Sequence, residues 1–257
     1  MPAPIDDQTV LITGASSGIG ASCAQVFAAA GAQLILAARR QEPLEQLAAD
    51  LTKNYGSNIH WLELDVSDRS AVASSLSSLP SPWQAVDVLI NNAGLSRGLD
   101  KLYEGDVQGW EEMIDTNIKG LLYVTRALVP GMVERGRGCV VNIGSTAGHQ
   151  TYPGGNVYCG TKAAVRSISE GLKQDLLGTP VRVCCVDPGL VETNFSNVRF
   201  HGDTKRAEDV YKGMTPLTPE DVADVVFFCV TRPAHVNILD VVLMPTDQAP
   251  GMLIHRR

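Results

Sequence analysis

Short apolar runs alternate with longer amphipathic segments along the whole chain. Runs rich in branched aliphatic residues predict strands at 9–12, 33–38, 59–64, 86–90, 138–143, 181–186 and 237–243. The segments between them predict helices at about 19–30, 43–54, 69–79, 110–135, 157–178 and from Pro219 onward, with Thr218 as N-cap. Strict alternation predicts an α/β fold: a Rossmann-like, doubly wound parallel sheet of about seven strands with helices on both faces.

Three segments do not fit the alternation. Residues 95–105 are irregular, and the polar stretch within 190–214 follows a strand end, where a long loop is a candidate substrate lid. The tail, 244–257, is apolar in places. The chain has 257 residues, which suits a single domain covering 1–257.

Composition narrows the function classes. Hydrophobic residues make up 44% and charged residues 19%, as in ordinary globular proteins. A net charge of −7 without basic runs argues against nucleic acid or an anionic membrane as partner. No apolar run is long enough to span a bilayer, and we see no leader-like segment before the first predicted strand. The six cysteines and five histidines are not arranged as metal ligands. We therefore expect a cytoplasmic protein with reduced thiols and no metal.

A glycine-rich turn follows the first predicted strand. Gly14, Gly18 and Gly20 lie between that strand and an alanine-rich helix, where phosphates can approach the backbone and the helix N-terminus. The spacing differs from G-x-G-x-x-G, so that pattern adds no specificity here. The alternative is a tight strand–helix turn without a ligand.

The end of the second predicted strand bears on the cofactor. Ala38 stands where an NAD site usually has an acid, and Arg39 and Arg40 follow. Arginines attract a 2′-phosphate, so NADP(H) is favoured, although both could be solvated loop charges. Asp65, at the next strand end, could contact adenine or cap a helix.

Tyr158 and Lys162 are spaced i and i+4 on a predicted helix. This spacing places an ammonium beside a phenol, and a positive neighbour favours phenolate, which makes the tyrosine a candidate acid/base. Ser145 follows a strand and could donate to a developing oxyanion. Asn117 is unfavourable in mid-helix unless it has another task. A Tyr and a Lys four apart could also be merely one edge of an amphipathic helix.

Together, these motifs resemble the short-chain dehydrogenase/reductase family over essentially the whole chain. The resemblance implies that Tyr158 is the acid/base, that Lys162 lowers its pKa and holds the nicotinamide ribose, and that Ser145 orients the carbonyl. It also implies that Asn117 anchors a water-linked proton relay. The cofactor residues expected from the motifs and the resemblance are Gly14, Ser16, Ser17, Gly18, Ile19, Gly20, Arg39, Arg40, Asp65, Val66, Asn92, Ala93, Gly94, Tyr158, Lys162, Pro188, Gly189, Val191 and Thr193.

The C-terminal third is similar to the NADP-dependent 3-hydroxy acid dehydrogenases. The similar segments are 189–193, 195–200, 217–222 and 233–238. This resemblance implies hydride transfer at the 3-position of serine, allo-threonine or 3-hydroxypropionate, the last giving malonic semialdehyde, in a homotetramer. Substrate would contact Ser145 and Tyr158, and Arg199 could bind its carboxylate or be a surface ion-pair residue. The alternatives are a broad-specificity NADPH-dependent carbonyl reductase and a non-catalytic NADP-binding sensor.

Overall fold

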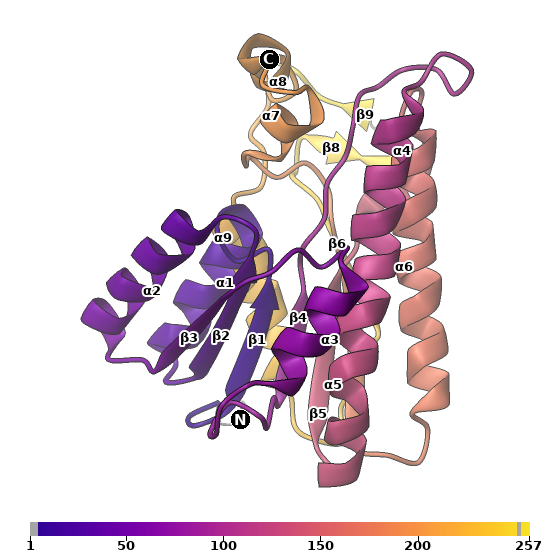
Figure 1. The fold of residues 1–257 in the computed structure, drawn as a ribbon. Helices are drawn as coiled ribbons and strands as arrows, with labels where there is room; N and C mark the ends of the chain where they lie inside the picture. Colours follow the sequence, from indigo (N-terminus) through magenta and orange to yellow (C-terminus); the bar gives the residue numbers. More distant parts are fainter. Residues whose placement is uncertain (1–4, 251–252) are drawn as a thin grey trace.

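The computed structural model describes residues 5–250 and 253–257, which form one parallel seven-stranded sheet between two helical layers (Figure 1). The strand order is β3-β2-β1-β4-β5-β6-β7, with every neighbouring pair parallel. The strands are β1 Thr9–Thr13, β2 Gln33–Ala38, β3 Ile59–Glu63, β4 Val88–Asn91, β5 Gly138–Ile143, β6 Val181–Pro188 and β7 Asp240–Leu243. This arrangement confirms the predicted fold class.

Helices cover both faces of the sheet (Figure 1). One layer holds α1 Gly18–Ala29, α2 Gln41–Tyr55 and α9 Pro219–Val230. The other holds α3 Arg69–Ser77, α4 Val107–Ile114, α5 Leu121–Arg135 and α6 Asn156–Asp175. Central strands are apolar along their length because both faces are buried, and β1 has no exposed residue.

The strand order reverses between β1 and β4. In an open α/β sheet, a ligand crevice forms outside the carboxyl ends of the strands at such a point. The glycine-rich turn after β1 and the small residues after β4 and β5 lie at this edge. The topology therefore gathers the predicted motifs, which are far apart in sequence, at one rim.

The long helix predicted over 110–135 is interrupted in the structure. A π-helical segment, Asp115–Gly120, separates α4 from α5. One extra residue per turn in such a segment rotates the following side chains, and π segments are frequent at functional sites. Asn117 lies inside it.

Two short helices occur in the polar segment that the sequence left irregular. They are α7 Phe195–Arg199 and α8 Thr204–Asp209, and both lie above the carboxyl ends of the strands (Figure 1). A small hairpin from the tail, β8 Gln248–Ala249 with β9 Leu253–Ile254, lies beside them. The Arg257 amide donates to the Gly213 carbonyl at 2.7 Å, so the tail is tied to the end of this segment.

Within the described residues, no helix is both long and apolar enough to cross a membrane.

Candidate active site

A cavity of about 390 Å³ opens at the carboxyl ends of the strands. Most of the predicted site residues line it. They are Gly14, Ser16, Ser17, Gly18, Ile19, Arg39, Arg40, Asp65, Val66, Asn92, Ala93, Gly94, Ser145, Tyr158, Lys162, Pro188, Gly189, Val191, Thr193 and Arg199. Two predicted residues do not line it: Gly20 packs beneath the glycine-rich turn, and Asn117 lies behind the wall. The structure thus brings one continuous set of side chains and backbone groups together.

The glycine-rich turn leaves room that a side chain would fill. Gly14 has a φ of +65°, a conformation that L side chains rarely adopt. A Cβ at Gly20 would lie 2.5 Å from the Gly14 carbonyl oxygen and 2.6 Å from Asn92 Nδ2. Asn92 in turn donates to the Thr13 carbonyl at 2.9 Å, which fixes the turn against β4. A backbone cradle of this kind at the start of α1 fits the diphosphate of a dinucleotide.

The two arginines after β2 have different positions. Arg40 donates to the hydroxyls of Ser16 and Ser17, at 3.1 Å each, and so lies over the glycine-rich turn. Arg39 is more than half exposed, with its guanidinium 3.9 Å from the Asp65 carboxylate. Arg40 is therefore the better placed of the two to meet a 2′-phosphate.

Asp65 does not cap the following helix. Its carboxylate accepts from the amide and hydroxyl of Ser67, at 2.9 and 2.7 Å, and the N-cap of α3 is Asp68. The capping alternative is wrong, and Asp65 lines the cavity.

Tyr158 and Lys162 project from the same face of α6 into the cavity, as their spacing predicts. The Lys162 Nζ atom lies 5.9 Å from the centroid of the Tyr158 ring and donates to the Ile143 carbonyl at 2.8 Å. Ser145 follows β5, and its hydroxyl accepts from the Ala147 amide at 3.1 Å. Tyr158, Lys162 and Ser145 are each less than a tenth exposed, so charges in this corner interact strongly.

Burial dominates the titration of both Tyr158 and Lys162. It raises the pKa of Tyr158, and the largest opposing influence is the Arg199 guanidinium, followed by a hydrogen bond from Ser145. Burial lowers the pKa of Lys162 to about 8, opposed by Cys185 and Asp187. Sequence spacing pointed to Lys162 as the cation that lowers the pKa of the phenol, whereas here Arg199 is the largest influence in that direction and burial outweighs it.

Asn117 holds the wall behind the site. Its amide oxygen accepts from the Leu95 amide at 2.8 Å, and its Nδ2 donates to the Leu95 carbonyl at 2.8 Å and to Thr161 Oγ1 at 3.0 Å. The side chain therefore joins the π-helical segment to the loop after β4 and to α6. An asparagine in mid-helix suggested that its side chain has a task outside the helix, and these hydrogen bonds are such a task.

Arg199 is buried although it comes from α7 in the polar segment. Its guanidinium lies 5.3 Å from the Tyr158 ring centroid and 5.1 Å from that of Phe195, and it donates to Tyr152 Oη at 3.2 Å. Among the described residues its Nε has no hydrogen-bond partner and no carboxylate pairs with it. The alternative of a surface ion-pair arginine is wrong.

Sequence reasoning missed Tyr152 and Gln248, which also line the cavity. Tyr152 positions Arg199, while Gln248 Oε1 accepts from the Leu190 amide at 2.8 Å and so links the tail to the strand-end loop after β6. The only signal for Gln248 was the apolar character of the tail, and Tyr152 was hidden in a turn rich in glycine and proline.

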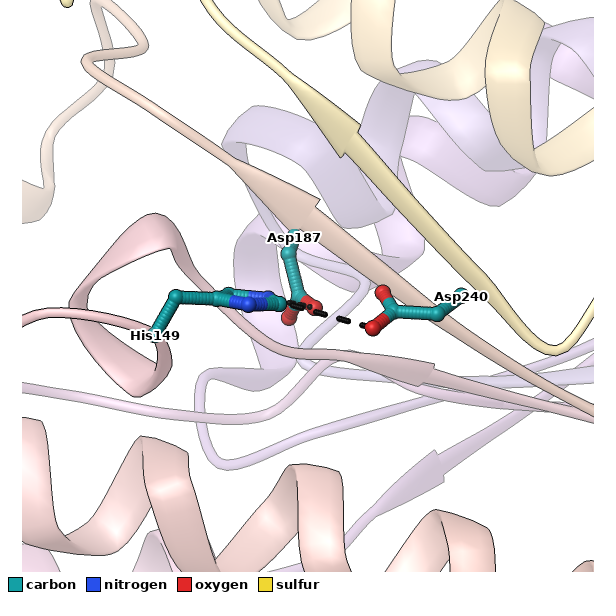
Figure 2. A group of neighbouring side chains, drawn as sticks. All are labelled: His149, Asp187 and Asp240. Atoms are coloured by element: carbon teal, nitrogen blue, oxygen red, sulfur yellow. Dashed lines mark hydrogen bonds and ion pairs between the residues drawn. The ribbon is translucent and has the colours of Figure 1, made fainter. Parts of the chain in front are cut away.

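Sequence reasoning also missed a cluster of one histidine and two aspartates. Figure 2 shows His149, Asp187 and Asp240 converging from the turn after β5, from β6 and from β7. Their donor atoms all lie within 4.8 Å of one another, a grouping that sequence spacing did not indicate.

Known proteins are similar to this chain over nearly its whole length. The family model described as short chain dehydrogenase matches residues 8–203. The NADP-dependent 3-hydroxy acid dehydrogenase YdfG of Escherichia coli strain K12 is 49% identical over 250 residues, covering 96% of this chain and 99% of that protein. The NADP-dependent 3-hydroxy acid dehydrogenase of Schizosaccharomyces pombe is 44% identical, covering 98% of each chain.

Solved structures are similar over the same length. The closed form of serine dehydrogenase complexed with NADP+ has a TM-score of 0.92 and 48% identity, covering 97% of this chain and 100% of that chain. Serine dehydrogenase from Escherichia coli has a TM-score of 0.81 and 44% identity, covering 94% and 100%. These relatives confirm the expected NADP cofactor and an enzyme acting on CH-OH groups. The chain belongs to the short chain dehydrogenase family.

Proposed function

We propose that this enzyme interconverts small 3-hydroxy acids and their 3-oxo acids with NADP(H), with serine, allo-threonine and 3-hydroxypropionate (the last giving malonic semialdehyde) as candidate substrates. The relatives named as 3-hydroxy acid and serine dehydrogenases support the substrate class. The observation that carries the proposal is the buried Arg199 guanidinium beside Tyr158, with no acidic partner among the described residues.

A buried cation without a counter-charge is costly, and a substrate carboxylate would remove that cost. The guanidinium carbon is 5.3 Å from the Tyr158 ring centroid, so even a short molecule can contact both Tyr158 and Arg199. A carboxylate at Arg199 would direct the far end of a short hydroxy acid toward the phenol and Ser145. The acid group and the reacting alcohol would then be recognised by different elements, α7 and α6.

The proposed catalytic roles follow from the positions of the side chains. Tyr158 takes the alcohol proton during oxidation and returns it during reduction, and Ser145 donates to the same oxygen. Lys162 holds a positive charge next to this pair, and Asn117 fixes the wall through which a proton relay would pass. Bound NADP supplies the hydride acceptor or donor.

The cofactor site would be built from both halves of the cavity. The glycine-rich turn, with Arg40 over it, would hold the diphosphate and 2′-phosphate, while Asp65 and Val66 would lie near adenine. Asn92, Ala93 and Gly94 would contact the ribose side, and the 188–193 segment the nicotinamide.

The substrate class is tested by turnover of a panel of hydroxy acids and size-matched uncharged alcohols and ketones. Arg199→Ala should lower kcat/KM for hydroxy acids by roughly 30- to 150-fold, the value of a charge-assisted hydrogen bond of about 2–3 kcal/mol. Turnover of uncharged ketones should change only a few-fold.

Arg206→Ala is the matched control. Arg206 lies in the same segment and stacks on Phe200 at 4.4 Å, but it does not line the main cavity. Equal losses on charged and uncharged substrates would remove the carboxylate role and favour a broad carbonyl reductase. Binding of NADPH without turnover of any panel member, with Tyr158→Phe leaving the protein's biological output unchanged, would favour a non-catalytic sensor.

We also propose that residues 190–214 act as the substrate lid. Tyr211 Oη donates to the Val191 carbonyl at 2.8 Å and contacts Ser196, so the two ends of the segment close on each other above the cavity. Slower proteolysis or hydrogen exchange of this segment with NADP and a hydroxy acid present would support the lid, and unchanged protection would contradict it.

A cytoplasmic homotetramer is the assembly that we propose. All six cysteines are free and buried, which suits a reducing compartment. Apolar side chains are exposed on the outer helices and the edge strand, at Leu122, Phe228 and Val242. Light scattering coupled to gel filtration should give four times the monomer mass of 27.5 kDa.

A further inference from the structure

The Asp187 carboxylate is buried beneath the catalytic corner and accepts hydrogen bonds from two strand ends. Its Oδ1 accepts from the Ser145 amide at 2.8 Å and from the Cys185 thiol at 3.3 Å, and its Oδ2 faces His149 Nε2 at 2.7 Å (Figure 2). An ionised carboxylate only accepts hydrogen bonds, so the Ser145 amide and the Cys185 thiol fit the charged form, and His149 fits it in the tautomer that carries a proton on Nε2. Asp187 thus holds the backbone of the residue whose hydroxyl would orient the substrate.

The backbone is shaped to admit this carboxylate. A Cβ at Gly144 would lie 1.6 Å from Asp187 Oδ1, so any side chain at that position would occupy the space of the carboxylate. Gly144 precedes Ser145, and its own amide donates to the Val186 carbonyl at 2.8 Å. The junction of β5 and β6 is therefore built around Asp187.

Charged and titratable groups reach Asp187 from each neighbouring element. Burial and the Asp240 carboxylate of β7 raise the pKa of Asp187, whereas the hydrogen bonds of His149 and Cys185 lower it. Asp240 is itself 3.3 Å from the Arg166 guanidinium, which also pairs with Glu170 on α6. The charge of Asp187 also acts on the two titratable side chains of the catalytic corner. It opposes the effect of burial on the pKa of Lys162, and it raises the pKa of Tyr158.

Hydrogen bonding describes this cluster better than metal ligation does. His149 Nε2 and Asp187 Oδ2 are 2.7 Å apart, whereas two ligands of a tetrahedral zinc ion lie about 3.3 Å apart. The other Asp187 oxygen is engaged by the Ser145 amide, and Asp240 has a cationic partner in Arg166.

We propose that Asp187 and His149 are positioning residues for the reaction. The Asp187 carboxylate fixes the Ser145 backbone and places a buried negative charge behind Lys162, and His149 donates to its outer oxygen. This inference rests on the proposed function only in that Ser145, Tyr158 and Lys162 carry the proton chemistry; it does not depend on the substrate's carboxylate.

Two substitutions separate position from charge. Asp187→Asn retains an oxygen that can accept from the Ser145 amide but removes the charge. We expect kcat for carbonyl reduction to fall about 10-fold and the alkaline limb of its pH profile to move about one unit lower, because Lys162 and Tyr158 would lose their protons more readily. Asp187→Ala also removes the acceptor, so we expect the same pH shift and a fall of about 100-fold, as for a misplaced catalytic group.

Asp87→Asn is the matched control. Asp87 is a buried aspartate whose carboxylate accepts from the Thr9 amide at 3.1 Å and pairs with Arg137 at 2.8 Å, at the amino ends of the strands. Its loss should lower stability and leave the pH profile unchanged. Thermal unfolding and NADPH fluorescence titration of every variant separate a folding defect from a catalytic one.

His149 gives a second, milder test because its side chain is 26% exposed and its replacement should be tolerated. His149→Ala should move the acid limb of kcat/KM to higher pH, since Asp187 would lose a donor that favours its charged form. His149→Gln, which can donate an amide proton, should restore part of the wild-type profile.

These experiments distinguish failure of the positioning role from failure of the proposed substrate class. Asp187 variants should lose hydroxy acid and uncharged ketone turnover equally, while Arg199→Ala should affect the acids selectively. If folded Asp187→Asn and His149→Ala proteins retain the wild-type kcat and pH profile on both substrate types, the positioning role is overturned.

Discussion

Tyr158 lies near two buried cations that are held in different ways. Lys162 comes from the same helix, α6, and its ammonium donates to the Ile143 carbonyl in the sheet. Arg199 comes from α7 above the strand ends; Tyr152 Oη accepts a hydrogen bond from its guanidinium, and its Nε has no partner among the described residues. One cation belongs to the rigid scaffold and the other to the proposed lid.

The difference between the two cations shows how the Tyr158 phenol can serve acid/base chemistry and also respond to closure over the substrate. Burial brings the pKa of Lys162 to about 8, so its charge depends on pH, whereas a guanidinium stays charged under all ordinary conditions. Because Arg199 is the largest influence that opposes burial at Tyr158, movement of α7 away from the site would raise the pKa of the phenol. Acid/base chemistry would then be coupled to closure over the substrate.

The largest expected effect is that of Lys162→Met. Loss of the scaffold cation should lower kcat by about 100-fold or more on hydroxy acids and uncharged ketones alike, the scale of an acid/base contribution. Steady-state kinetics on both substrate types measure this loss. Lys173→Met, about three turns along the same helix, is the control. A loss confined to hydroxy acids would contradict the comparison, because it would give Lys162 the role proposed for Arg199.

An intermediate effect is expected in the pH profile of Arg199→Leu. With an uncharged alcohol as substrate, carboxylate binding does not contribute and only the influence on Tyr158 remains. Removing the guanidinium should raise the pKa of Tyr158, so the acid limb of alcohol oxidation should move to higher pH by about one unit. Arg199→Lys should stay near the wild-type profile. Identical profiles for the leucine and wild-type proteins would show that the two cations do not share Tyr158.

The smallest effect concerns a cation remote from Tyr158. Arg40→Leu should lower the preference for NADP over NAD about 10-fold without changing kcat at saturating cofactor, because the Arg40 guanidinium would contact only the 2′-phosphate. Arg39→Leu should have less effect, since its guanidinium faces Asp65. Combining Arg39→Leu with Ala38→Asp should shift the preference further toward NAD, because a carboxylate repels the phosphate. Cofactor titrations of the four proteins rank these contributions.

Local patterns predicted most of the scaffold. The strand runs and the Tyr158–Lys162 spacing depend on neighbours within one element, so sequence alone indicated them. The π-helical segment was not predictable in this way, because one extra residue in a turn leaves no clear periodic signal at 115–120. The short helices α7 and α8 were missed because each spans less than two turns, too little for a helical repeat.

The rest of the site depends on contacts between distant segments. Arg199 was chosen from its residue type, yet its burial against Tyr158 and Tyr152 follows from how α7 packs. Asp187 and His149 are 38 residues apart and meet only because β5 and β6 are neighbours and position 144 lacks a side chain. Gly144 was visible in the sequence only as one of several small residues.

The burial of Lys162 has a practical consequence for chemical labelling. An amine with a pKa of about 8 is partly neutral in mildly alkaline buffer and therefore nucleophilic there, while ordinary surface lysines remain protonated. Lys162 lines the cavity, so we expect a small activated ester to acylate it, and a small aryl aldehyde to form an imine with it, in preference to surface lysines. That residue is consequently the natural anchor for a covalent inhibitor, and bound dinucleotide should shield it.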